Sequence, residues 1–253
     1  MFTILLALGT PGFAGSYSSG TFGYTNDDTN WEVYGEAVED YSLVKGSNLV
    51  WTIDEVNLYA FWMTTTSGLP AGAYTAYKFY TDGSATSTDW EKAKNDNIFN
   101  DAGDYNYFAG HGSSGAFALS AGYGDNAVTG AETSWGDQDA EVVALATCQS
   151  LDASGRTAFG GANLNTGVHY ILGMHSSMDD NTTAGGNYAW YLRYGYSVRD
   201  AWIAATRDAM ASTRTAAYVR FYSSSCNTYG DTAYAVSCDP KASSGYNTAT
   251  WTL

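Results

Sequence analysis

The chain has 253 residues, and its 45% hydrophobic and 15% aromatic content excludes a disordered protein. Its 26 acidic residues outnumber its 11 basic residues, which gives a formal net charge of -15. A negative field of this size repels nucleic-acid phosphates and anionic membrane surfaces, so both are excluded as partners. The length suits one large α/β domain with a substantial core.

Residues 1–15 hold an apolar run that ends in small residues, the pattern of a secretory signal peptide cleaved after Ala14. The basic residues that usually open such a peptide are missing, so a buried first strand is the alternative. The remaining residues, 16–253, are predicted to form the single domain. No other stretch approaches the roughly 20 apolar residues that cross a membrane.

The first half of the domain alternates short apolar runs with helical patterns. Strands are predicted where such runs stop at turn residues, and helices where capping residues precede apolar periodicity. The predicted strands are 31–38, 74–80 and 105–110. The predicted helices are one that begins at a capping box at Thr52 and ends before Gly68, and a short one over 88–94.

The second half continues this alternation and adds two long polar, glycine-rich connections, 113–139 and 150–167, which are predicted to be loops. Strands that alternate with helices predict a three-layer α/β/α sandwich with a mostly parallel sheet. The predicted strands are 141–147, 168–176, 216–222 and 232–237, and the predicted helices are 185–194 and 197–213, the second capped by Ser197.

Two of the predicted strands end in chemically capable side chains. His111 follows the strand over 105–110, and Cys148 follows the strand over 141–147. Each residue type alone is more often a buried core residue than a reactive one. Because ligands bind beyond the carboxyl ends of parallel strands, we expect both side chains on one rim of the sheet, as an active-site pair.

The chemistry of this pair follows from the two residue types. A thiol is a strong nucleophile only as the thiolate, and a neighbouring imidazole favours that form or returns a proton to the leaving group. Gly112 leaves its backbone N–H unobstructed, so it is expected to stabilise an oxyanion together with the Cys148 N–H.

The motifs Gly110-His111-Gly112 and Ala146-Thr147-Cys148-Gln149-Ser150 resemble those of the clan of cysteine peptidases that contains caspases, legumains, gingipains and clostripain. Within it, the chain is most similar to an uncharacterised family of bacterial and archaeal proteins. It departs from caspases, because Ser150 replaces a glycine and His111 and Cys148 are 37 residues apart rather than about 50. The resemblance spans roughly 50–211.

The resemblance implies a caspase-like fold and a secreted cysteine endopeptidase that acts on polypeptides through His111 and Cys148. It implies no cofactor, with calcium left open, and self-assembly is not specified. In these peptidases the strand after the cysteine walls the primary specificity pocket. Asp179 or Asp180 is therefore expected to select a basic residue before the scissile bond, and a solvated turn is the alternative for this pair.

Two other functions compete with peptide hydrolysis. His111, Cys148 and His175 are ligand types that zinc accepts with one position open, and His169 lies six residues before His175, but the chain has no HExxH motif and no Cys-x-x-Cys pair. The preferred interpretation therefore places no metal in the site. The other alternative is a non-catalytic cell-surface or filament-forming protein that keeps a peptidase-like fold.

The three cysteines divide into Cys148 and a pair near the C-terminus. Cys226 and Cys238, 12 residues apart across a predicted hairpin, are predicted to form a disulfide, which leaves Cys148 as the free thiol. Disulfides persist in oxidising compartments, so the pairing predicts a secreted or cell-surface protein. Low lysine with abundant Asp, Ser, Thr and Tyr is typical of such proteins, although a solvated acidic surface also explains the charge.

Overall fold

The computed structural model describes residues 32–44, 46–65, 74–120, 126–233 and 244–253. The predicted signal peptide, 1–15, lies outside the described residues. Among those described, no helix is both long and apolar enough to span a membrane.

Seven strands form one mixed, mostly parallel sheet in the order β10-β9-β8-β7-β3-β1-β2. The first five in chain order are mutually parallel, β9 runs antiparallel to β8, and β10 runs antiparallel to β9. Their bounds are β1 (Glu32–Ala37), β2 (Thr75–Thr81), β3 (Tyr105–Ala109), β7 (Val142–Ala146), β8 (Tyr170–Met174), β9 (Thr215–Tyr222) and β10 (Gly245–Thr252). This sheet confirms the predicted α/β fold class.

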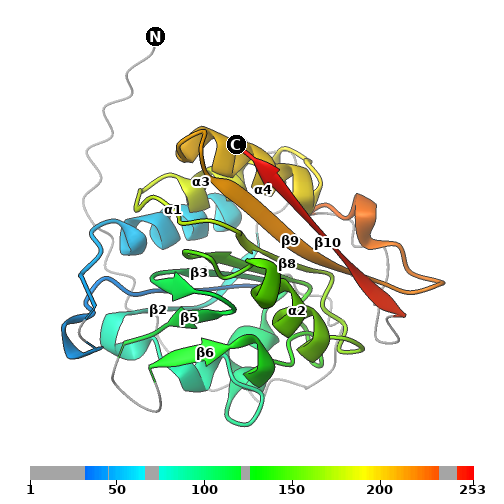
Figure 1. Ribbon diagram of the computed structural model, residues 1–253, viewed down its shortest axis with the longest axis horizontal. Coiled ribbons are helices and arrows are strands. Elements are labelled where there is room, and N and C mark those ends of the chain that lie inside the picture. The colour runs from blue at the N-terminus through cyan, green and yellow to red at the C-terminus, as the bar shows by residue number, and fades with distance from the viewer. Residues whose placement is uncertain (1–31, 45, 66–73, 121–125, 234–243) are drawn as a thin grey trace.

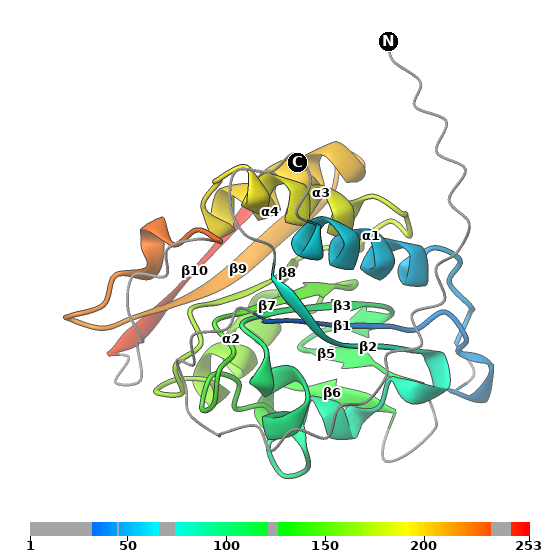
Figure 2. The same ribbon diagram turned by 180° about the vertical axis from the view of Figure 1, so that it is seen from behind.

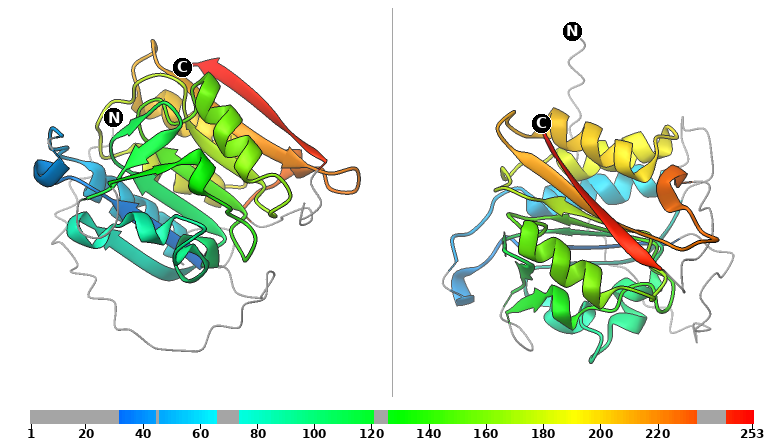
Figure 3. Two further views of the ribbon diagram at one scale, coloured as in Figure 1. Left: turned by 60° about the horizontal axis from the view of Figure 1, so that its bottom comes forward. Right: turned by 45° about the vertical axis from the view of Figure 1, so that its right-hand side comes forward.

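Helices cover both faces of the sheet, which gives three layers (Figures 1 and 2). One face carries α1 (Thr52–Thr64), α3 (Ala184–Arg193) and α4 (Val198–Ala209). The other carries α2 (Ala153–Ala162) and a small sheet of β4 (Gly112–Ser113), β5 (Ala116–Ala118) and β6 (Ala127–Thr129). Figure 3 shows β10 at the outer edge of the large sheet, with α2 on the side away from α3 and α4.

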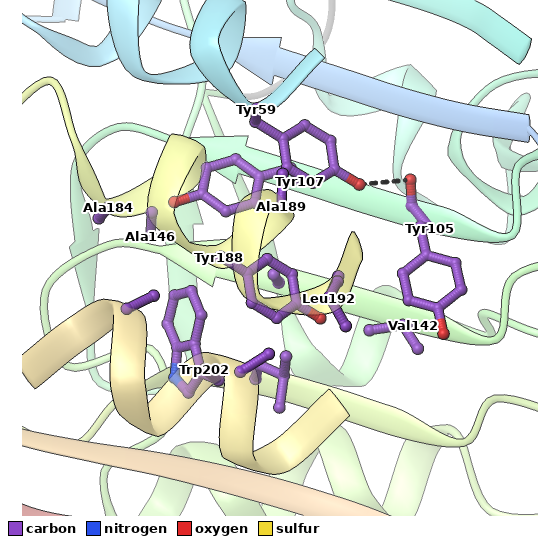
Figure 4. Packing of buried hydrophobic residues seen from close by; sticks show 14 of the residues in the cluster. Tyr59, Tyr105, Tyr107, Val142, Ala146, Ala184, Tyr188, Ala189, Leu192 and Trp202 are labelled. Carbon is purple, nitrogen blue, oxygen red and sulfur yellow. Dashed lines mark hydrogen bonds between the residues drawn. The ribbon is translucent and has the colours of Figure 1, made fainter. Parts of the chain in front are cut away.

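Each central strand is buried on both faces, because successive side chains enter the two core layers in turn. In β3, Tyr105 and Tyr107 pack under the three helices, whereas Phe108 packs toward the small sheet. Figure 4 shows the helix-side cluster, in which Tyr59 donates to the Tyr105 carbonyl oxygen at 3.0 Å. Tyrosine suits these positions because the rings of Tyr59, Tyr105 and Tyr107 fill the core while their hydroxyls each reach an oxygen acceptor.

The structure differs from several predicted elements. The segment 88–94 forms no α-helix: Ser87–Asp89 is a single 3-10 turn, capped by Thr86. The connection 113–139 contains all of the small sheet except Gly112, and 150–167 contains α2. The strand predicted over 232–237 lies mostly outside the described residues, and the chain instead closes with β10.

The helix caps give one confirmation and one correction. Ser197 accepts from the Asp200 N–H at 3.2 Å and caps α4, as predicted. At α1 the predicted capping box is absent, because Trp51 occupies the cap position and the Thr52 hydroxyl donates to the Val38 carbonyl at 2.9 Å. Thr52 therefore ties the start of α1 to the end of β1.

Candidate active site

His111 and Cys148 extend two neighbouring strands of the large sheet. The parallel register of β3 and β7 pairs Ala109 with Ala146, so each candidate residue follows its strand by the same two positions. Gly110 continues the ladder, since its N–H donates to the Ala146 carbonyl at 3.3 Å. The structure thus brings both residues to the carboxyl rim of the sheet.

Gly112 holds the two strand ends in close contact. A Cβ atom at this position would lie 2.6 Å from the Thr147 Cβ and 2.7 Å from the Cys148 carbonyl oxygen. Real Cβ atoms do not approach so closely, so only glycine lets the His111 segment pack directly against the Cys148 backbone. The residue predicted to supply an oxyanion N–H therefore also sets the spacing between the two segments.

The His111 ring is oriented by residues from the loop after β1. Its Nε2 lies 2.6 Å from the Ser47 carbonyl oxygen, which can only accept, so Nε2 carries the proton and Nδ1 is the basic nitrogen. The ring packs against Tyr41, with centroids 4.4 Å apart. The Tyr41 hydroxyl accepts from the His111 backbone N–H at 2.8 Å and donates to the Ala118 carbonyl at 3.0 Å.

Burial keeps the Tyr41 hydroxyl in its donating form. It raises the pKa of Tyr41 well above the ordinary value, outweighing the His111 N–H, which lowers the pKa. The neutral phenol therefore fixes both the backbone and the ring of the candidate base, in the manner of a third group that orients a catalytic imidazole.

Cys148 carries a free, half-buried thiol. Its Sγ accepts from the Met178 N–H at 3.2 Å. The chain then turns sharply: Gln149 has a φ of 55°, and its N–H donates to the Ser176 carbonyl at 2.9 Å. Because of this left-handed turn, Cys148 lies beyond the end of β7. The next residue but one, Ser150, is fully buried and packs on β8.

The family DUF6345, a domain of unknown function, matches residues 35–252. The chain belongs to this family. No curated protein matches the chain. The matched range contains β3, β7 and both candidate residues, so the rim is part of the DUF6345 domain itself.

Asp179 and Asp180 follow β8 on the same rim, and both are engaged. Arg214 forms an ion pair with the Asp179 Oδ1, and the Ala211 N–H donates to its Oδ2 at 3.1 Å. The hydrogen bond from Arg214 is the main reason why the pKa of Asp179 is lowered. Asp180, which is exposed, accepts from the Val50 N–H at 2.9 Å. The preference for basic residues stays a prediction, and the pairing of Asp179 with Arg214 counts against it.

The structure does not assemble the alternative zinc set. His175 lies on the rim, but its Nδ1 is 3.0 Å from Nη1 of Arg156, a cation that disfavours a metal ion there. His169 lies at the opposite end of β8, buried, with its Nδ1 2.7 Å from Asp231. Within the described ranges, His111, Cys148 and His175 do not bring their ligand atoms together.

The described residues do bring three carboxylates together at the amino ends of the strands. Oxygens of Glu32, Asp104 and Asp139 lie within 4.8 Å of one another, the kind of oxygen set that a hard cation such as calcium takes. Burial first, and then the charges of Asp139 and Glu32, raise the pKa of Asp104 to about 8 against the lowering effect of the Glu32 N–H. Sequence reasoning missed this group, although Glu32 lies at the start of one predicted strand and Asp104 directly precedes another.

Sequence reasoning also missed the residues that support His111 and Cys148. Tyr41 and Ser47 come from a loop more than sixty residues before His111, and Arg214 precedes β9. No local motif marks them. The one available signal was topological: a strand antiparallel to β8 must begin at the rim where β8 ends, which would have placed Arg214 there.

The predicted disulfide includes a cysteine that lies outside the part of the chain that the structure describes. Cys226 is 2% exposed, and its predicted partner, Cys238, lies outside the described residues. The pairing therefore stays a prediction, as does the secreted or cell-surface location that it supports.

Proposed function

We propose that this DUF6345 protein is a cysteine peptidase in which Cys148 is the nucleophile and His111 the general acid and base. The carrying observation is that the two residues extend adjacent parallel strands in matched register, joined through the close backbone contact at Gly112. Supporting it, the Cys148 thiol is free and half-buried, and the His111 ring is fixed with Nδ1 as its basic atom.

The first half of the reaction forms a thioester. Nδ1 of His111 takes the thiol proton, and the Cys148 thiolate attacks the peptide carbonyl carbon, so that the C–S bond forms and the carbonyl electron pair moves to oxygen. Backbone N–H groups of Gly112 and Cys148 stabilise that oxyanion. When it collapses, the C–N bond breaks and the protonated His111 gives its Nδ1 proton to the departing amine.

The second half releases the acid product. A water molecule gives a proton to Nδ1 of His111 and attacks the thioester carbonyl. The tetrahedral oxyanion collapses, the C–S bond breaks, and Cys148 leaves as the thiolate. Ser47 contributes throughout, because its carbonyl oxygen holds the Nε2 proton and stabilises the positive ring formed in each half.

The direct test is turnover of a mixed peptide library by wild type, Cys148→Ala and His111→Gln, read by mass spectrometry. Wild type is expected to cleave peptides, and each variant is expected to lose at least about a thousandfold in rate, as removal of a nucleophile or its base does. His175→Gln is the matched control, because it removes an imidazole from the same rim that has no role in the reaction. Circular dichroism checks the fold of each variant.

A different result would favour the non-catalytic alternative. If wild type cleaves nothing under reducing conditions, with and without calcium, the protein is better explained as a cell-surface or filament component. If Cys148→Ala or His111→Gln retains the wild-type rate, cleavage comes from another site or a contaminant, and the assignment fails.

A further inference from the structure

Arg214 lies beside the candidate nucleophile because β9 begins where β8 ends. The two strands are antiparallel, and the ladder continues past β8: the Thr215 carbonyl accepts from the His175 N–H at 2.9 Å and from the Ser176 N–H at 3.2 Å. The residue before β9 therefore reaches the segment that follows β8, which is the segment in contact with Cys148.

The Arg214 guanidinium bridges both neighbours of the residue that contacts the thiol. Its Nη1 donates to the Ser177 Oγ at 3.1 Å, and its Nε donates to the Asp179 Oδ1 at 3.0 Å. Between these two residues stands Met178, whose N–H reaches the Cys148 Sγ at 3.2 Å. The charge of Cys148 contributes to the raised pKa of Arg214, after the larger effect of the Asp179 hydrogen bond.

Asp179 acts as the support of this cation rather than as an available anion. Both of its oxygens are engaged, Oδ1 by Arg214 and Oδ2 by the Ala211 N–H. A guanidinium has five N–H groups, and the bonds to Ser177 and Asp179 occupy three of them. The Arg214 side chain is 29% exposed, so solvent and ligands reach it.

We infer that Arg214 is the specificity-determining residue of this site, and that it binds a carboxylate of the substrate, the side chain of an Asp or Glu before the scissile bond. The inference rests on the proposed function for its substrate but not for the anion subsite itself. A fixed guanidinium is the side chain best matched to a carboxylate, because it can donate two parallel hydrogen bonds. A basic side chain would instead meet a like charge beside Cys148.

The first experiment needs no peptidase activity. The rate at which Cys148 is alkylated is measured with iodoacetate, which carries a carboxylate, and with iodoacetamide, which is neutral, in wild type and in Arg214→Gln. The ratio of the two rates is expected to fall by about tenfold in Arg214→Gln, because one charged partner of the anionic reagent is lost. Arg214→Lys keeps the charge and is expected to give an intermediate ratio.

Arg199→Gln is the matched control. Arg199 is also paired with an aspartate, Asp200, but it lies at the start of α4, where the Val198 N–H donates to the Asp231 carbonyl at the amino end of the sheet. Its loss changes the net charge equally and is expected to leave the ratio unchanged. An unchanged ratio in Arg214→Gln, or an equal fall in Arg199→Gln, would overturn the inference.

The second experiment compares peptides that differ only in the residue before the scissile bond: Asp, Asn or Arg. Wild type is expected to prefer Asp over Asn by at least about tenfold in kcat/KM, and Arg214→Gln to remove that preference while changing the Asn peptide by less than about threefold. Cleavage that prefers Arg would overturn the inference and leave the peptidase assignment standing. An Arg214-dependent alkylation ratio without any cleavage would support the anion subsite and overturn the peptidase.

Discussion

The two ends of the large sheet carry very different chemistry. At the carboxyl rim, His111 and Cys148 are half-buried; the Ser47 carbonyl holds Nε2 of His111, and the Cys148 Sγ accepts from the Met178 N–H. At the amino edge, Asp104 is 5% exposed and crowded by other carboxylates, which together with burial raises its pKa to about 8. A strongly perturbed pKa thus lies away from the groups best arranged for catalysis.

This contrast shows what a pKa shift does and does not indicate. Titratable groups with a strongly shifted pKa often mark functional sites, but burial alone can shift a pKa as far. Glu55 is a second case: burial raises its pKa to about 8, although it accepts a hydrogen bond from Tyr107 at 2.5 Å and packs inside the helix layer. Accessibility and mutual geometry, rather than the size of a shift, distinguish the carboxyl rim as the candidate site.

Among substitutions that keep both His111 and Cys148, the largest effect is expected from breaking the contact that joins the two strand ends. Gly112→Ala places a Cβ 2.6 Å from the Thr147 Cβ, so the His111 segment must move away from Cys148. We expect a loss of at least about a hundredfold in kcat/KM, because small displacements of catalytic groups are costly. The measurement is initial rate on the best library peptide, together with thermal unfolding.

Gly161→Ala is the control for this substitution. A Cβ at position 161 would meet nothing within 4 Å, and the residue lies near the end of α2. Alanine is expected to stabilise that helix by up to about 1 kcal/mol and to leave turnover unchanged. Equal activity of the two variants would show that the spacing at Gly112 is not needed for function.

A smaller effect is expected from a substitution at the amino edge, and there it is a gain in stability rather than a loss of activity. Because the pKa of Asp104 is raised to about 8, the folded chain keeps a proton that the unfolded chain releases above pH 4 or so. The stability that this bound proton contributes is therefore fully present in acid and is lost as the pH rises toward 8. Asp104→Asn removes this loss and keeps an oxygen acceptor for the Glu32 N–H.

Urea unfolding from pH 4 to pH 8 measures the effect. At pH 8 we expect Asp104→Asn to be more stable than wild type by about 1 to 3 kcal/mol, with little difference at pH 4. Asp179, at the carboxyl rim, is expected to show the opposite pH dependence. Because its pKa is lowered, its contribution to stability is lost as the pH falls. A wild-type profile that Asp104→Asn leaves unchanged would show that the crowded carboxylates do not control stability at this edge.

The sequence predicts the central elements of this fold well because their burial is local in the pattern. The runs of β3, β7 and β8 are buried at every position, are apolar apart from Asn106 and are soon followed by polar residues, which fixes both their type and their common rim. The predicted positions of His111 and Cys148 follow from these runs, because each residue comes two positions after the end of one of them. An edge strand lacks that signal, and β10 was missed because half of its residues are exposed.

Tertiary contacts explain the other failures. The helix α2 was hidden by glycines that the fold requires: Gly155 packs against the Ser150 carbonyl and Gly160 against the Tyr246 ring. The one local signal was Asp152, whose side chain accepts from the Gly155 N–H at 2.8 Å and caps the helix. The partners of His111 and Cys148 come from distant loops, so only the assembled sheet identifies them.

The smallest expected effect concerns Asp180, the rim carboxylate that Arg214 does not neutralise. It is exposed and accepts from the Val50 N–H at 2.9 Å, a hydrogen bond that the oxygen of an asparagine can also accept. Asp180→Asn is therefore expected to change the free energy of unfolding by less than about 0.5 kcal/mol. The kcat/KM of peptides with Asp or Asn before the scissile bond should change by less than about threefold.

Asp180→Asn also tests whether Asp180 or Arg214 selects the residue before the scissile bond. If Asp180 were the selecting group, its loss would weaken Arg and Lys peptides by at least about tenfold, as expected when the carboxylate partner of a bound cation is removed. The Arg214 variants would then leave the Asp peptide unaffected. Because Asp180 contacts the Val50 loop while Arg214 is bonded to both neighbours of Met178, we expect the specificity to follow Arg214. Parallel kcat/KM measurements on Arg and Asp peptides with both variants give the answer.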